Sequence, residues 1–160
     1  MNQLEDRETC EAIVRASRAG LPINLIVSGF SVLAAGVAGA TDKVRIISVI
    51  GRFLEHSRIY FFQNGSPDPL GGEFYIGSAD WMRRNLSERV EAVTPVEAAA
   101  LRARLWEILD VMLRDHRQAW EMRSDGSYVQ RQPAEGATGP EAMGTQQTLM
   151  DLTRRRQAEG

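Results

Sequence analysis

A histidine and an arginine, His56 and Arg58, stand just before an apolar run in the stretch FLEHSRIYFF. Side chains on a strand alternate between its two faces, so residues two apart can project from the same side. A neutral imidazole can exchange a proton at about pH 7, and a guanidinium can bind two phosphate oxygens with its planar fork. The pair therefore indicates phosphate chemistry. The alternative is a histidine that simply packs under a sheet.

A second motif, YIGSADWMRRN, reads as the end of a strand followed by a polar turn. Gly77 lets the backbone approach a ligand, Ser78 offers a hydroxyl, and the amides that follow can receive an anion. Asp80 and two arginines lie in the turn. The motif alone is equally compatible with a strand end that has no ligand.

A third candidate is Arg89 in the stretch ERVEAV, which is expected at the start of a strand. Its guanidinium can bind a phosphate oxygen, or it can form an ordinary surface pair with Glu91. The sequence pattern does not decide between these two roles.

The elements that must position these residues predict an α/β domain, because helical and strand patterns alternate along the chain. A first helix is expected over 6–19, and a second is expected from Thr94 and Pro95, a cap followed by proline, to about Arg117. Residues 29–40 are expected to form a loop, whereas 44–56 fit either a strand or a helix. The expected strands are INLIVSG, buried on both faces, then RIYFFQNG, EFYIGSAD and RVEAV.

The C-terminal part is expected to be looser. A turn in RSDGSYV leads into a short strand, and QPAEGATGPEAMG has the composition of a linker. The last stretch, TQQTLMDLTRRRQAEG, is either a docked terminal helix or a poorly ordered, loosely docked tail. We therefore predict one domain over 1–132, and a linker with a terminal helix or tail over 133–160.

Composition limits the possible partners. The formal net charge is −2, from 19 basic and 21 acidic residues, which argues against general adhesion to nucleic acid or membranes. The single cysteine, Cys10, excludes an internal disulfide and a zinc cluster of cysteines, which fits a reducing, cytoplasmic setting. No apolar run approaches the roughly 20 residues of a membrane span.

Taken together, the first two motifs, HSR and GSAD, are similar to one half of a phospholipase D type of active site. Such a site uses two histidines from two similar domains, one attacking phosphorus and one handling the proton of the leaving group. The chain has one such half. His116, between Asp115 and Arg117, is not in a comparable setting.

Longer stretches resemble the C-terminal domain of the bacterial polyphosphate kinase family, in the same order. They are GLPINLIVSG, SVIGRFLEHSRIYFF, FYIGSADWMRRNLSERVEAVTPV and YVQRQP. The resemblance implies a phospholipase D-like mixed sheet flanked by helices. It also implies reversible transfer of the terminal phosphate of ATP to inorganic polyphosphate. The phosphohistidine of that family belongs to the preceding domain, which this sequence does not include.

The resemblance also implies roles for individual residues. His56 matches the second histidine of the family, and Arg89 matches an arginine that reaches the ATP phosphates. With Arg58 and Ser78, these residues are expected to contact the nucleotide. Mg²⁺ is expected from the family, but no ligands for it are expected in this chain. Ser28 stands where the family usually has an arginine, and Arg83 is a conceivable partial replacement.

Two other functions remain open. The first is a phosphodiesterase half-site completed by homodimerisation, and the second is a degenerate, non-catalytic module that binds nucleotide or polyphosphate. The start, MNQLEDRETC, resembles an internal segment of the family, so the chain is either a fragment or a separately encoded domain. Oligomeric state and reaction direction are also left open.

Overall fold

Four strands form the central sheet of the computed structural model, which describes residues 1–159. In spatial order they are β2 (Ile23–Ile26), β4 (Val44–Val49), β8 (Ala119–Met122) and β9 (Tyr128–Gln130). The β2–β4 pair is parallel and the other two pairs are antiparallel, so the sheet is mixed. The predicted α/β class is thereby confirmed.

One of the two inner strands of this sheet is β4, so residues 44–49 of the segment 44–56 are a strand, whereas residues 50–56 are neither strand nor helix. Val44 to Val49 form a strand in which Arg45 is the one exposed residue. β-branched residues suit such a buried strand. The prediction that β2 is buried on both faces is wrong, because Asn24 is exposed and Ile23 and Ile26 are only half-buried.

The N-terminal segment covers one face of the central sheet. Helix α1 (Arg7–Arg18) begins after Asp6, whose carboxylate caps it by accepting the Thr9 amide at 2.8 Å. The short strands β1 (Gln3–Leu4) and β3 (Phe30–Ser31) pair in parallel beside it. The main core includes Leu4, Ile13, Leu25 and Ile46. The expected helix 6–19 is therefore confirmed.

A second, antiparallel sheet carries the segment that follows the HSR motif. Its strands are β5 (Ile59–Phe62), β6 (Glu73–Gly77) and β7 (Val93–Pro95), with the short turn η1 (Pro69–Gly71) between the first two. The predicted neighbours β5 and β6 are confirmed, with Tyr60 opposite Tyr75. On the other face, Phe61 packs on Phe74 and on Trp106 of the long helix α3 (Ala99–Leu113).

The prediction that this helix starts at Thr94 is wrong. Thr94 pairs with Ile76 as part of β7, and α3 begins only at Ala99. The predicted strand RVEAV contributes only its last residue to β7, and residues 89–92 form an irregular segment after helix α2 (Arg83–Glu88). α3 also ends at Leu113, before the predicted Arg117, and there Arg131 Nη1 donates to the Leu113 carbonyl at 2.9 Å.

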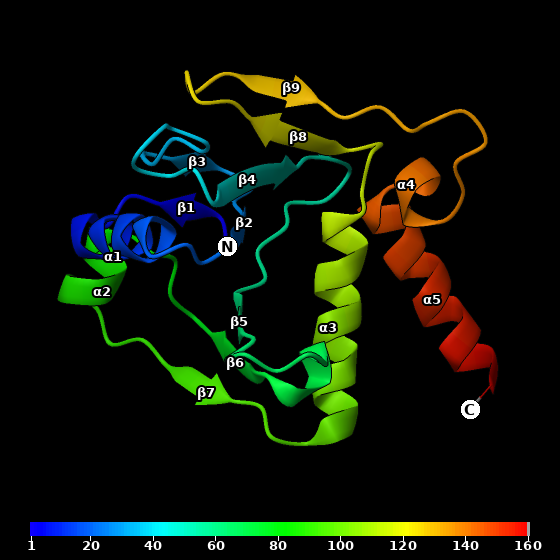
Figure 1. Cartoon of the computed structure of the whole chain (residues 1–160). Helices are drawn as coiled ribbons and strands as arrows, with labels where there is room; N and C mark the ends of the chain where they lie inside the picture. The colour runs from blue at the N-terminus through cyan, green and yellow to red at the C-terminus, as the bar shows by residue number, and fades with distance from the viewer. Residues whose placement is uncertain (160) are drawn as a thin grey trace.

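The chain closes with two helices, α4 (Pro140–Met143) and α5 (Thr145–Glu159). Of the two expectations for this segment, the docked helix is the one found, because α5 lies beside α3 (Figure 1). Arg156 of α5 also pairs with Glu107 of α3 at 2.5 Å. In the first turn of α5, Thr145, Gln146 and Thr148 are buried. The proposed domain boundary at 133 stays a prediction. Over residues 1–159, none of the helices combines the length and apolarity that crossing a bilayer requires.

Candidate functional site

His56 lies in the irregular segment 50–58, which connects β4 to β5 and is called loop 50–58 below. The expectation that His56 and Arg58 project from one face of a strand is wrong, because β5 begins only at Ile59. The two side chains nevertheless meet. Arg58 Nη2 lies 2.9 Å from His56 Nε2, and Arg58 Nη1 lies 3.2 Å from His56 Nδ1. The exposed imidazole thus lies against a guanidinium.

The guanidinium of Arg58 is held from its other side by Asp80. Arg58 Nη2 and Nε donate to the two carboxylate oxygens at 2.9 and 3.3 Å, and the Asn2 amide adds a third bond at 2.7 Å. Asp80 is only 4% exposed. Burial alone raises the pKa of Asp80, but the bonds from Asn2 and Arg58 and the charge of Arg58 outweigh it and hold the pKa below its usual value. The positive charge of Arg58 is therefore largely compensated within the chain.

Ser78 directly follows β6, and both its hydroxyl and its amide are already hydrogen-bonded within the chain. Its hydroxyl donates to Glu91 and accepts from the Ala92 amide at 3.0 Å, while its own amide donates to the Ala92 carbonyl at 3.0 Å. Asn85 donates to the other oxygen of Glu91 at 2.6 Å. The structure thus places Ser78 in a polar junction that ties β6 to the segment after α2.

Glu91 and Asn85 are residues of this junction that sequence reasoning missed as site residues. The bonds from Ser78 and Asn85 come first among the causes that hold the pKa of Glu91 below its usual value, and the charges of Arg89 and Arg58 add to them. Glu91 therefore stays ionised near neutral pH. Both residues flank the predicted motifs, but no local pattern indicated that they pair.

Arg89, unlike Arg58, has a side chain that is free to bind an external group. It directly follows α2, is exposed, and is close enough to Glu91 to affect its ionisation. Its side chain makes no ion pair or hydrogen bond within residues 1–159. Of the two expected arginines, Arg89 is therefore the one whose charge can meet an external anion.

The position of the missing arginine is tightly packed. Ser28 follows β2, and its Oγ is buried without a partner among residues 1–159. Its carbonyl accepts the Ser48 hydroxyl at 3.2 Å. Arg83, the conceivable replacement, is exposed and lies 3.7 Å from Glu88 in its own helix. Replacement by Arg83 stays a prediction.

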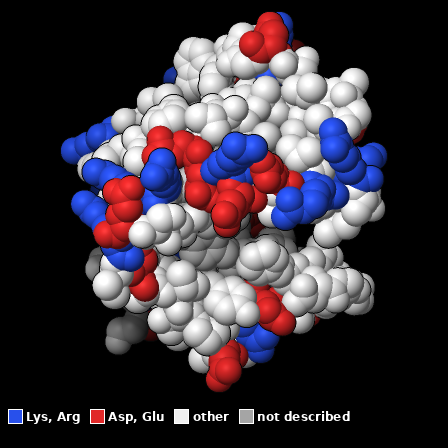
Figure 2. Space-filling view, turned by 90° about the vertical axis from the view of Figure 1, so that its left-hand side faces the viewer, with Lys and Arg blue, Asp and Glu red and all other residues white. Residues whose placement is uncertain are grey.

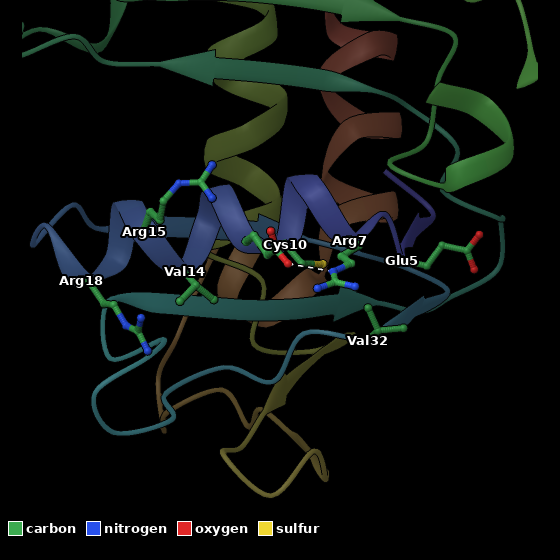
Figure 3. Close-up of a pocket in the computed structure, with 8 residues that line it drawn as sticks. Glu5, Arg7, Cys10, Val14, Arg15, Arg18 and Val32 are labelled. Atoms are coloured by element: carbon green, nitrogen blue, oxygen red, sulfur yellow. Dashed lines mark hydrogen bonds and ion pairs between the residues drawn. The ribbon is translucent and has the colours of Figure 1, made fainter. Parts of the chain in front are cut away.

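A groove on the outer side of α1 is separate from these residues (Figure 3). Its walls include Glu5, Cys10 and Val32, and an Arg7–Glu11 ion pair of 2.8 Å lies at its edge. Burial, with a smaller effect of Asp6, raises the pKa of the Cys10 thiol and keeps it protonated. On the face that carries α1 and α2, basic and acidic side chains are interspersed (Figure 2).

The Arg58–Asp80 pair is expected to make stability depend on pH. Because the folded-state pKa of Asp80 lies below the unfolded value of 3.8, its stabilisation is complete above that value and is lost as pH falls through the lower, folded one. Urea unfolding of the parent chain and of Asp80→Asn between about pH 6 and pH 2 should show a gap that closes in acid. The exposed Asp42→Asn is the control. A gap that stays constant with pH would contradict this.

Comparison with known proteins identifies the family of the chain. The model of the family described as polyphosphate kinase C-terminal domain 2 matches residues 1–141. The chain is 51% identical to the polyphosphate kinase of Thermosynechococcus vestitus over 153 residues, 96% of the chain and 20% of that protein. It is 44% identical to that of Pseudomonas aeruginosa over 151 residues, 94% of the chain and 21% of that protein.

A solved structure extends the agreement to the fold. The crystal structure of polyphosphate kinase from Porphyromonas gingivalis superposes with a TM-score of 0.85 at 31% identity, covering 99% of this chain and 23% of that one. The chain thus has the mixed α/β fold of a polyphosphate kinase C-terminal domain. It belongs to the polyphosphate kinase C-terminal domain 2 family. It spans about a fifth of the length of the curated relatives it matches.

Proposed function

We propose that the chain forms the ATP-side wall of a polyphosphate kinase, a phosphotransferase that moves the terminal phosphate of ATP onto inorganic polyphosphate. The observation that carries this proposal is the exposed imidazole of His56 resting on the Arg58–Asp80 pair. An imidazole held in a defined orientation at the surface can serve a reacting phosphate, whereas a core histidine cannot.

In this proposal the residues divide the work. His56 exchanges a proton with, or hydrogen-bonds, the phosphoryl group in transfer, and Arg89 neutralises phosphate charge. Arg58 acts on the phosphates mainly by orienting His56, because the ion pair with Asp80 already compensates most of the positive charge of Arg58. A bond from Ser78 to a phosphate oxygen requires its hydroxyl to turn away from Glu91.

Mg²⁺, which the family implies, does not fit the carboxylates of this site. Residues 1–159 contain no group of three or more His, Cys, Asp or Glu side chains that could hold a metal ion. The oxygens of Asp80 are taken by Arg58 and Asn2, and those of Glu91 by Ser78 and Asn85. If Mg²⁺ enters with ATP, its protein ligands come from outside this chain.

The proposed reaction needs a partner domain. Covalent transfer requires a nucleophile, which the resemblance assigns to a preceding domain, so ATP, polyphosphate and that domain are the proposed partners. A reducing, cytoplasmic setting is part of the proposal and fits the single cysteine. A homodimeric phosphodiesterase and a binding module without turnover remain the competing functions.

We expect the isolated chain to bind ATP weakly and to make no polyphosphate, because one half of the site is missing. Adding the separately expressed preceding domain of a relative should restore ATP-dependent synthesis, measured as acid-insoluble phosphate. The matched control is the same mixture with His56→Ala. Synthesis by the chain alone would contradict the proposal. Cleavage of a phosphodiester by the chain alone would favour the homodimer, and ATP binding without turnover in the mixture would favour the binding module.

A further inference from the structure

Loop 50–58, which carries His56, has little apolar packing of its own. Phe53 is 51% exposed and Leu54 is 73% exposed, although both are large apolar side chains. Packing therefore does not hold the loop, and its orientation depends on polar contacts.

Those contacts come from the C-terminal helix. The Gln146 side chain accepts the Phe53 amide at 3.1 Å, and its Nε2 donates to the Phe53 carbonyl at 2.7 Å. One side chain thus pairs with both backbone groups of a residue 93 positions away. Within residues 1–159, these are the hydrogen bonds that reach residues 51–57 from outside the loop.

Gln146 is itself fixed in place. It is 8% exposed and lies in the first turn of α5, where helix amides have no partner in their own helix. Asp115 accepts the Thr145 amide at 2.7 Å, and Gln118 accepts the Gln146 amide at 3.4 Å. The segment 115–118 therefore caps α5 and sets the position of Gln146.

Gly51 lets the loop approach this clamp. A Cβ added at Gly51 would meet the side chain of Gln118 first and would also come within 2.7 Å of Gln146 Oε1, too close for an ordinary contact. At the other end of the loop, Arg58 is bound to Asp80. His56 thus lies between two fixed points of the loop, Phe53, which is bound to Gln146, and Arg58, which is bound to Asp80.

We propose that Gln146 is a positioning residue for His56, so that α5, which lies beyond the 1–141 match to the family, helps to build the phosphotransfer site. The physical tie stands on the structure alone, and its effect on turnover rests on the proposed function. Without the two hydrogen bonds from Gln146, the loop samples orientations in which the imidazole of His56 no longer contacts Arg58. Such misplacement lowers turnover more than it weakens binding of the substrate.

The test compares Gln146→Ala with the control Gln147→Ala. Gln147 is the next residue along the helix, is exposed, and bonds only to Asp151 in its own helix. In Gln146→Ala, the Phe53 amide should exchange with solvent about tenfold faster, since two hydrogen bonds are lost. The nuclear Overhauser effect between the His56 ring and the Arg58 side chain should weaken. Gln146→Glu keeps the acceptor for the Phe53 amide, so its Phe53 exchange rate should fall between those of the parent chain and Gln146→Ala. Gln147→Ala should match the parent chain.

In the enzyme reassembled with the preceding domain, Gln146→Ala should lower kcat about ten- to a hundredfold and leave KM for ATP little changed. An unchanged Phe53 exchange rate and an unchanged His56–Arg58 contact would overturn the inference, as would unchanged kcat in an active enzyme. If the parent assembly makes no polyphosphate, the proposed function fails instead, and the two NMR readouts still decide whether Gln146 positions His56. Circular dichroism melting separates either result from unfolding.

Discussion

Replacing His56 by alanine in the enzyme reassembled with the preceding domain is expected to lower turnover about 100- to 10,000-fold, the usual contribution of a positioned proton-transfer group. Stability should hardly change, because the imidazole is exposed and the Arg58–Asp80 pair does not depend on it. Steady-state synthesis of polyphosphate gives kcat, and a thermal melt of the chain alone gives stability.

The matched control is His116→Ala, which removes the other histidine of the chain from the turn that follows α3. Its turnover should stay close to that of the parent enzyme. If His56→Ala kept its turnover while its melting temperature fell by many degrees, His56 would be a structural histidine and the proposed site would be wrong.

The largest effect on stability is expected at Asp115, the residue that joins α3, β8 and α5. It is fully buried, with 0% exposed. One carboxylate oxygen accepts the amides of Arg117 and Gln118 at 2.7 Å each, and the other accepts the Thr145 amide at 2.7 Å. Asp115→Ala leaves three amides unpaired and should lower the free energy of unfolding by about 3–5 kcal/mol.

Asp125→Ala is the control for this second prediction. Asp125 makes the same kind of local turn, accepting the Ser127 amide at 2.9 Å, but it is exposed and holds no distant segment. Its loss should cost about 1 kcal/mol or less. Chemical denaturation of the three proteins gives the values. Equal stabilities for Asp115→Ala and Asp125→Ala would show that α5 docks without the buried carboxylate.

Several features could be predicted because they follow from short stretches of chain. β5 and β6 are apolar runs separated by a segment rich in glycine and proline, and such a pair forms wherever the turn allows it. The helix after Asp6 has its own cap. The resemblance to polyphosphate kinases, carried by HSR, GSAD and longer stretches, also needed no structure.

The start of α3 shows where local patterns lose to tertiary contacts. Thr94 and Pro95 have the signature of a helix start, yet β6 offers a partner strand, and pairing there delays the helix to Ala99. Pairing of β7 with β6 stabilises several residues at once, whereas a helix cap stabilises only one helix end, so the strand forms in preference to an earlier helix start.

The site divides in the same way. The sequence by itself determined which side chains are capable of phosphate chemistry, because a residue's type and its neighbours set that chemistry. Only the tertiary structure decided that Arg58 is bound to Asp80, that Arg89 is available, and that Gln146 clamps the loop of His56. These contacts join residues distant in sequence, and no local periodicity records them, because each depends on how the elements pack in space.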